Sequence, residues 1–430
     1  MDGLWHTPGN WDHGIVPNNS GVAALFNADT TVALASGVSI KKLTFNASVT
    51  LNGPGTFTFP AQYKTGEVTV ASSKTATFNA LVSSAFEGIP KTGLGTLVLV
   101  GDHRFGGKLD VREGVAEINQ TTEGALMNRD YTTAEQATLR FVCAAIGPVG
   151  TQLTGTQWVT GDGTFEVVSG YLRVQSSGYK VNMAMSEKGQ IIVRAGAKMD
   201  NSNGANDRYA NNKAKLVVEA TALFGLNAES VKIGSLHGSG EVKADWDSRM
   251  LTITGDTDGA FSGTLTQKDA ANRLSLTKAG LSTQILSGVS SYTGATTING
   301  GCLTLAGGNN RLSINTPVTV TNAVLNLGLT QQTLNNNPDF RAESMLAVDV
   351  SKTAIGCLTL TNSIDVTGWK VTLNNPSDYP KGKRYAVIST GTDKVITGTP
   401  TLVDTPSGFI IYSQNNTIYV DFPAMVIFFR

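Results

Sequence analysis

The segment from Lys91 to Ile118 reads KTGLGTLVLVGDHRFGGKLDVREGVAEI, and a second segment, from Lys278 to Leu305, reads KAGLSTQILSGVSSYTGATTINGGCLTL. The two align without a gap at an offset of 187 residues, and each holds three short apolar stretches separated by glycines. The matching pairs are Lys91 and Lys278, Gly93 and Gly280, Thr96 and Thr283, Gly101 and Gly288, Phe105 and Tyr292, Gly107 and Gly294, Val111 and Ile298, and Gly114 and Gly301. A unit of this size can bury its apolar face only against neighbouring units, which is the property of a solenoid repeat.

A rhythm of two apolar residues around one threonine extends beyond these two segments. It occurs at Leu43–Phe45, Val49–Leu51, Phe57–Phe59, Val68–Val70, Leu251–Ile253, Leu303–Leu305, Val318–Val320, Leu358–Leu360 and Val371–Leu373. Each triplet predicts a short strand whose apolar residues point inward and whose threonine points outward. The intervening glycine- and asparagine-rich pieces are too short for helices and suit corners. We therefore predict an all-β fold, a parallel β-helix (β-solenoid) that is right-handed, with loop excursions and a capped N-terminus.

A β-sandwich is the rival fold. It needs longer strands joined by hairpin turns, and the dipeptides Asn52-Gly53 and Asn299-Gly300 are typical of such turns. The sequence pattern alone therefore does not exclude a β-sandwich.

The composition limits the classes of function. The 430 residues include 33 basic and 33 acidic side chains, and charged residues make up only 15%. A chain without a basic field has no electrostatic basis for binding nucleic acid. The three cysteines form neither a disulfide framework nor a zinc motif. The first residues show no signal-peptide pattern, and no apolar run reaches membrane-spanning length, since Ala424–Phe429 has only six residues.

The second segment resembles a known family. Its core, LSGVSSYTGATTINGGCLTLAG, is similar to the autotransporter-associated β-strand repeat, also called the passenger-associated transport repeat. The pieces Ile233–Val242 and Gly255–Thr264 resemble the segment that often precedes the unit, and the opening, with Leu4-Trp5 and Gly9–Trp11, resembles the start of such repeat regions. Together these pieces cover about a third of the chain. The 28-residue unit is the more specific signal, and the tryptophan-containing opening is the weaker one.

The resemblance implies a secreted or cell-surface bacterial protein whose repeat region folds as a β-helical stalk. In autotransporters, a C-terminal β-barrel carries such a passenger across the outer membrane. This sequence ends at Arg430, soon after Val420–Pro423, and leaves no room for a barrel of many strands. We therefore expect either a passenger fragment or a relative without a barrel, at an extracellular or outer-surface location.

The strand rhythm suggests five regions along the chain. We expect an N-terminal cap and first coils at 1–60, β-helix with the first repeat unit at 61–118, an irregular solenoid region with exposed loops at 119–232, β-helix with the second unit at 233–330, and C-terminal coils with a cap at 331–430. Exposed loops are predicted at Asp200–Arg208 and Gln331–Arg341. Ala214–Phe224 suits either a short helix or, over Lys215–Glu219, a strand.

Tests for catalysis find no motif. The polygalacturonase-like motifs and the lipase-type serine elbow are absent. Two pairs of acids are the only candidates for a shared cation or acid–base chemistry, and a solvated turn is the simpler interpretation of both. These acids are Asp245, Asp247, Asp256 and Asp258. We therefore assign no catalytic or cofactor-binding residue, expect no cofactor and leave a metal site undetermined.

The remaining reactive side chains also suit structural roles. The four histidines, His6, His13, His103 and His237, are scattered, which favours turn or surface positions over a catalytic base. The aromatic residues Trp5, Trp11 and Phe26 can stack on sugars, but covering the first coil is the favoured use. Cys302 and Cys357 lie 55 residues apart, two or more coils at about 22 residues per coil. That distance is too great for a disulfide, so we predict free thiols.

The sequence thus favours a non-catalytic bacterial surface or secreted β-solenoid, a stalk or adhesin-like passenger region that displays loops. Glycans or host and cell-surface molecules are the expected partners, with no nucleic acid and no membrane span in this chain. A carbohydrate-binding or polysaccharide-cleaving β-helix is the alternative.

Overall fold

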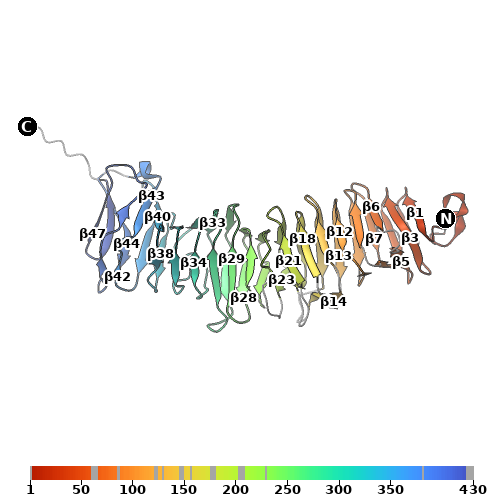
Figure 1. Ribbon diagram of the computed structural model, residues 1–430, viewed down its shortest axis with the longest axis horizontal. Coiled ribbons are helices and arrows are strands. Elements are labelled where there is room, and N and C mark those ends of the chain that lie inside the picture. The colour runs from red at the N-terminus through yellow and green to blue at the C-terminus, as the bar shows by residue number, and fades with distance from the viewer. Residues whose placement is uncertain are drawn as a thin grey trace, which may run out of the picture. The chain divides into compact units, whose positions relative to one another are not determined.

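A computed structural model describes residues 2–59, 66–84, 88–120, 124–127, 130–144, 150–154, 157–174, 181–201, 209–227, 230–379 and 382–422. The chain forms two compact units, Met1–Glu229 (unit 1) and Ser230–Arg430 (unit 2). Both are all-β, and short strands stack in chain order within each unit (Figure 1). The predicted parallel β-solenoid is confirmed, whereas its right-handed winding and the five-region subdivision stay predictions.

Unit 1 is built from parallel sheets in which each strand pairs with the equivalent strand one coil further along. The first sheet contains β2 (Thr30–Ala33), β4 (Val49–Asn52), β7 (Thr75–Phe78), β10 (Thr96–Val100), β13 (Val115–Gln120), β16 (Thr138–Cys143), β19 (Thr164–Ser169), β22 (Gln190–Val193) and β24 (Lys215–Val218). The second contains β1 (Asn19–Phe26), β3 (Val38–Phe45), β6 (Glu67–Val70), β9 (Ile89–Thr92), β12 (Leu109–Val111), β15 (Tyr131–Thr133), β18 (Gln157–Gly161) and β21 (Val181–Met185). A third face of the coils carries β5 (Thr56–Phe59), β8 (Leu81–Ser84) and β11 (Arg104–Phe105), and then β14 (Gly124–Met127), β17 (Thr151–Thr154), β20 (Tyr171–Val174), β23 (Lys198–Asn201) and β25 (Leu223–Leu226).

Unit 2 repeats this plan. One sheet contains β27 (Leu236–Gly238), β30 (Gly259–Phe261), β33 (Thr283–Leu286), β35 (Cys302–Leu305), β37 (Val324–Asn326), β40 (Met345–Asp349), β43 (Lys370–Asn374) and β46 (Thr401–Leu402). Another contains β26 (Val231–Ile233), β29 (Arg249–Ile253), β32 (Leu274–Lys278), β34 (Thr296–Ile298), β36 (Val318–Val320) and β39 (Asp339–Phe340). The other strands are β28 (Glu241–Ala244) with β31 (Thr264–Gln267), β38 (Gln331–Leu334) with β41 (Cys357–Leu360) and β44 (Arg384–Thr390), and the short pair β42 (Ile364–Asp365) and β45 (Ile396–Thr397).

The last strands of unit 2 change direction. β48 (Thr417–Asp421) pairs antiparallel with β44 and with β47 (Ile410–Gln414), whereas the stacked coils before them pair in parallel. An antiparallel strand covers a parallel edge that another coil would otherwise extend. The described helices are short 3₁₀ turns, η1 (Pro8–Asn10), η2 (Asp12–Gly14) and η4 (Pro376–Asp378).

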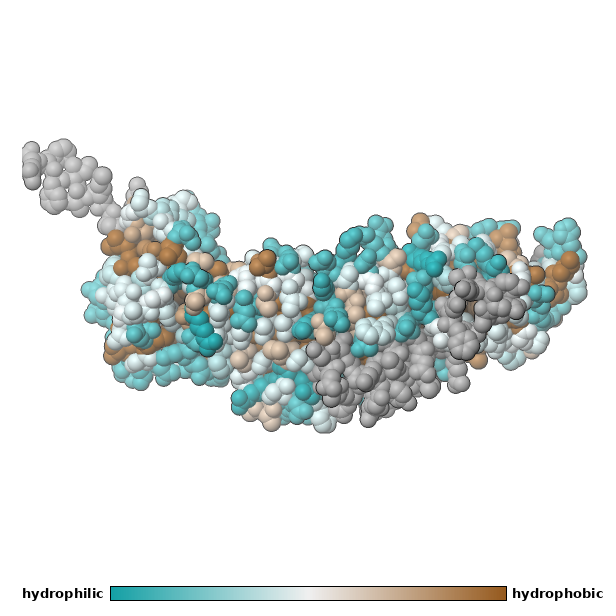
Figure 2. All heavy atoms as spheres, in the orientation of Figure 1, coloured by the Kyte–Doolittle hydropathy of each residue, from teal (hydrophilic) through white to brown (hydrophobic). Residues whose placement is uncertain are grey.

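The alternation of the strands follows the sequence pattern. In β10, Leu97 and Leu99 are buried and Val98 between them is not, and most threonines of the apolar triplets are likewise more exposed than the buried residues on either side. Thr252 is an exception, since it is buried within β29. On the face seen in Figure 2, hydrophilic and intermediate residues predominate, and strongly apolar ones form separate patches. The apolar side chains therefore fill the inside of the coils.

Aromatic residues cover the first coil of unit 1. Trp5 is fully buried, its indole N–H donates to the Pro17 carbonyl oxygen at 3.0 Å, and its ring lies 4.7 Å from that of Trp11 and 6.0 Å from that of Phe26. η1 and η2 precede β1 at the end of the unit marked N (Figure 1). The predicted N-terminal cap is confirmed, and these rings pack against the core.

The repeat unit proved longer than one coil. Lys91 in β9 pairs with Val111 in β12, and Thr96 in β10 pairs with Val115 in β13, so the 28-residue segment closes one coil and begins the next. The second segment does the same, with Lys278 opposite Ile298 and Thr283 opposite Cys302. Its glycines serve two purposes: Gly114 and Gly301 have positive φ (64° and 61°), while a Cβ on Gly280 would lie 2.1 Å from the carbonyl oxygen of Gly255 in the preceding coil.

Two local expectations changed. The predicted loop Gln331–Arg341 is wrong at both ends, because β38 and β39 occupy them. Gln332 explains part of this order: its side chain is fully buried and its amide bonds to the backbone N–H and C=O of Leu312. In the ambiguous segment Ala214–Phe224 the strand interpretation is confirmed by β24. Most of the predicted loop Asp200–Arg208 lies outside the described residues, as does Ala424–Phe429.

Candidate functional site

A buried lysine closes the corner of each repeated segment. The fully buried Lys91 ammonium donates to the carbonyl oxygens of Gly93, Gly95 (2.6 Å) and Glu113 (2.8 Å). Because Gly93 belongs to the same turn and Glu113 to the turn of the next coil, one side chain ties two stacked turns together. We call this arrangement the lysine clamp.

The second segment contains the same clamp. Lys278 is also fully buried, and its ammonium donates to the carbonyl oxygens of Gly280 (2.5 Å) and Gly300 (3.3 Å), the positions that match Gly93 and Glu113. Burial lowers the pKa of Lys91 to about 8, against a smaller opposing effect of the Glu113 carboxylate, and burial also lowers the pKa of Lys278. The carbonyl groups thus hold an ammonium that the interior disfavours.

Each clamp presents a leucine to solvent. Leu94 and Leu281 follow the clamped glycines Gly93 and Gly280 and are 68% and 80% exposed. A large apolar side chain exposed at the same place in both segments is a surface feature that the strand pattern does not require.

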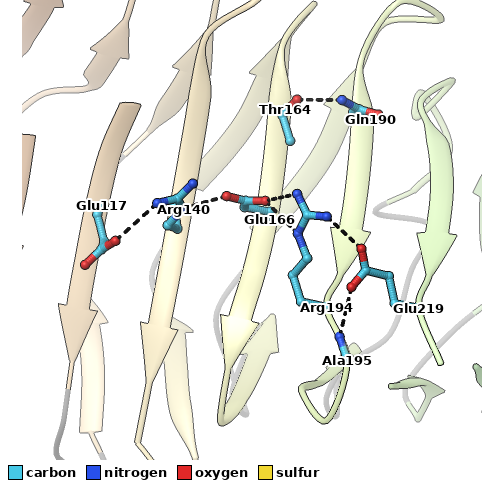
Figure 3. A network of polar contacts seen from close by, with 8 residues as sticks. All are labelled: Glu117, Arg140, Thr164, Glu166, Gln190, Arg194, Ala195 and Glu219. Carbon is cyan, nitrogen blue, oxygen red and sulfur yellow. Dashed lines mark hydrogen bonds and ion pairs between the residues drawn. The ribbon is translucent and has the colours of Figure 1, made fainter. Parts of the chain in front are cut away.

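A ladder of alternating charges crosses five coils of unit 1 (Figure 3). From β13 onward, Glu117 lies 3.6 Å from Arg140, Arg140 lies 2.6 Å from Glu166, Glu166 lies 2.6 Å from Arg194, and Arg194 lies 2.6 Å from Glu219. The Glu166 carboxylate is almost fully buried, with one oxygen bonded to each arginine. Hydrogen bonds to Glu166 raise the pKa of Arg194. The ladder therefore fixes the register between successive coils.

We expect Glu166→Gln to lower the free energy of unfolding by about 1–3 kcal/mol, because two arginines lose a buried anionic partner. Urea unfolding followed by circular dichroism measures the change. Glu135→Gln is the matched control, since Glu135 forms an exposed pair with Lys188 and its loss is expected to cost at most about 0.5 kcal/mol. Equal stability of the two variants would contradict a role for the ladder.

A buried polar cluster joins β20, β23 and the end of β25. The Asp200 carboxylate is fully buried, accepts hydrogen bonds from the Tyr171 hydroxyl and from Asn227 Nδ2 (2.7 Å), and lies 3.6 Å from Arg173 and 3.8 Å from Lys198. The Lys198 ammonium also lies 4.3 Å from the centroid of the Tyr171 ring. Burial raises the pKa of Tyr171, so its hydroxyl stays protonated and acts as a donor. Such a cluster joins three neighbouring strands of this face through one buried carboxylate.

A comparison with protein families bears on these corners. The family model described as passenger-associated-transport-repeat matches residues 91–115 and 276–306, which include both lysine clamps and both exposed leucines. Two segments of the chain are thus similar to the passenger-associated-transport-repeat. No curated protein matches the chain. The resemblance to this repeat is confirmed at the two segments that carry the clamps.

The four candidate acids do not gather into one site. In the second repeat's neighbourhood, Asp256 Oδ1 accepts from the backbone N–H of Leu281 (3.2 Å), and Asp258 Oδ1 accepts from that of Thr283 (2.7 Å). Both therefore cap the clamped turn. Asp245 and Asp247 instead follow β28 and pair with Lys243 (2.9 Å) and Arg249 (3.2 Å). Among the residues that the structure describes, no three histidines, cysteines or acids gather as metal ligands.

Three of the four histidines form hydrogen bonds with backbone groups or serine hydroxyls. A turn or surface position was expected for His103, but its side chain is buried. Its ring nitrogens contact the Val82 N–H (3.1 Å) and the Val100 carbonyl oxygen (2.9 Å). His6 contacts Ser36, His237 contacts Ser235, and His13 has a positive φ within η2.

The cysteines are free thiols, as predicted. Cys302 lies in β35 and Cys357 in β41, on different sheets of unit 2, so sheet position separates them in addition to coil number. Burial raises the pKa of all three thiols, that of Cys143 to about 12, which keeps them unreactive.

Sequence reasoning missed one cavity. It measures about 320 Å³, lies near the antiparallel end of unit 2, and is lined by residues that include Pro376, Tyr379, Phe409 and Phe422. The Tyr379 hydroxyl donates to the Val420 carbonyl oxygen, so its proton is not available to a ligand in the cavity.

No helix in the described parts of the chain is long and apolar enough to cross a membrane.

Proposed function

We propose that this chain is a non-catalytic passenger region of a secreted or cell-surface bacterial protein, which forms a rigid β-solenoid and displays loops for interaction. The observation that carries the proposal is the matched lysine clamp in two passenger-associated-transport-repeats within stacked β-solenoid coils. The lysine clamps and the charge ladder bond each of these coils to the next, which supports a rigid stack.

A non-catalytic role is supported by the local engagement of the candidate acids. Asp256 and Asp258 accept hydrogen bonds from backbone N–H groups, and Asp245 and Asp247 pair with Lys243 of β28 and Arg249 of β29. A general acid or base needs instead a carboxyl group directed at a substrate and tuned toward neutral pH.

Protease treatment of intact cells of the encoding bacterium tests the surface location. We expect proteinase K to remove the antibody signal of this chain while a cytosolic marker survives. Incubation of the purified chain with polysaccharides is expected to release no new reducing ends. A chain that is digested only after lysis, or that cleaves polysaccharides, would contradict the proposal.

A further inference from the structure

Two neighbouring loops of unit 2 lie around one exposed tryptophan, Trp246. The first loop, 245–248, follows β28, and the second, 268–273, follows β31, the strand paired with β28. Trp246 in the first loop is 60% exposed, and the Lys268 ammonium in the second lies 5.1 Å from its ring centroid. We call these two loops the Trp246 platform.

The platform is held rigidly. The backbone N–H of Asp247 donates to Asn272 Oδ1 at 2.5 Å, and that of Arg249 donates to the Arg273 carbonyl oxygen at 2.8 Å. Asp269 Oδ1 in turn accepts from the backbone N–H groups of Ala271 and Asn272 at 2.8 and 3.0 Å. Asp247 has a φ of 54°, a conformation that aspartate tolerates and that these bonds maintain. Binding of a ligand here therefore costs little conformational entropy, because the loops are already ordered.

The charges around the indole balance. The basic residues on these loops and at the adjoining strand ends are Lys243, Arg249, Lys268 and Arg273, and the acidic ones are Glu241, Asp245, Asp247 and Asp269. Equal numbers of each sign favour neither an anionic nor a cationic ligand. The two loops nevertheless carry carboxylates, a guanidinium and an amide, and these groups bond well to hydroxyls.

The size of the apolar surface argues against a protein partner. A stable protein interface buries about 800 Å² on each side around an apolar centre. Here one indole stands among charged side chains, and the carboxylate of Asp247 beside it is mostly exposed. A sugar ring matches this arrangement, because one face of the ring is apolar and its rim carries hydroxyls.

We propose that the Trp246 platform binds neutral oligosaccharides, with a sugar ring stacked on the indole and its hydroxyls bonded to the surrounding polar groups. This inference rests on the proposed function, since the platform meets such glycans only outside the cell. Neutral oligosaccharides are thus the ligand class expected for these two displayed loops.

Fluorescence titration of the purified full chain tests the site. The probes are tetrasaccharides of glucose, galactose, mannose and N-acetylglucosamine. We expect at least one to quench tryptophan emission with a Kd of about 1 mM or lower, and Trp246→Ala to weaken that binding about tenfold or more. Trp246→Phe keeps an aromatic face and is expected to retain most of the affinity.

Trp158→Ala is the matched control, because Trp158 is also exposed (43%) but lies in β18 of unit 1, and its loss is expected to leave binding unchanged. The proposal is overturned if no probe binds the wild type, if sulfated tetrasaccharides bind more tightly than neutral ones, or if both alanine variants lose affinity equally. Because these assays use purified protein, their failure is distinguishable from failure of surface exposure on cells.

Discussion

Replacing Lys91 with methionine is expected to lower the free energy of unfolding by about 2–4 kcal/mol. Methionine fills the space of the lysine stem but gives no donor to the carbonyl oxygens of Gly93, Gly95 and Glu113, which stay in the corner. The substitution also removes a charged group that burial disfavours, and this gain offsets part of the loss. Urea unfolding measures the change, and hydrogen exchange is expected to show lost protection at residues 91–115.

Lys108→Met in the same repeat is the control, because Lys108 is half-exposed and its loss is expected to cost at most about 0.5 kcal/mol. The pH dependence gives a second check. The pKa of Lys91 is lowered from 10.5 to about 8, so between these values the unfolded chain binds the proton more tightly than the folded one. The wild type should therefore gain stability relative to Lys91→Met as the pH rises from 8 to 10.5, with no relative change below pH 8. A difference that stays flat through this range would contradict the lowered pKa of Lys91 in the folded chain.

The sequence predicted the fold well because short strands leave a local signal. Triplets such as Leu303–Leu305 place two apolar residues inward whatever the length of the loops between coils. The coil length was harder to predict, since it varies: Thr96 pairs 19 residues further on with Val115, whereas Tyr131 pairs 28 residues further on with Val159. Extra residues between successive strands change this spacing without disturbing the strand pattern.

The charge ladder was missed for the same reason. The sequence separations between its successive bonded pairs from Arg140 to Glu219 are 26, 28 and 25 residues, so no fixed period connects them. The lysine clamp was visible as a matched pair in the alignment, but its role was not. Lysine is almost never fully buried, and the carbonyl groups that receive Lys91 and Lys278 have no signature in side-chain sequence.

Asp200→Ala is expected to lower the free energy of unfolding by about 3–5 kcal/mol, because it leaves two basic side chains beside a buried site with no anion. Arg173 and Lys198 lie 3.6 and 3.8 Å from the carboxylate, and Tyr171 and Asn227 would lose their acceptor. Urea unfolding gives the magnitude, and hydrogen exchange at β20, β23 and β25 shows whether the loss is local.

Two further variants separate charge from shape at this cluster. Asp200→Asn keeps an acceptor oxygen for Tyr171 but removes the negative charge, so its stability should fall between those of the wild type and Asp200→Ala. Asp162→Ala is the control, because Asp162 is exposed in the turn between β18 and β19 and its loss should change stability by at most about 0.5 kcal/mol. If Asp200→Asn is as stable as the wild type, hydrogen bonding rather than charge holds the three strand ends together. If Asp200→Ala is as stable as Asp162→Ala, the cluster does not anchor them at all.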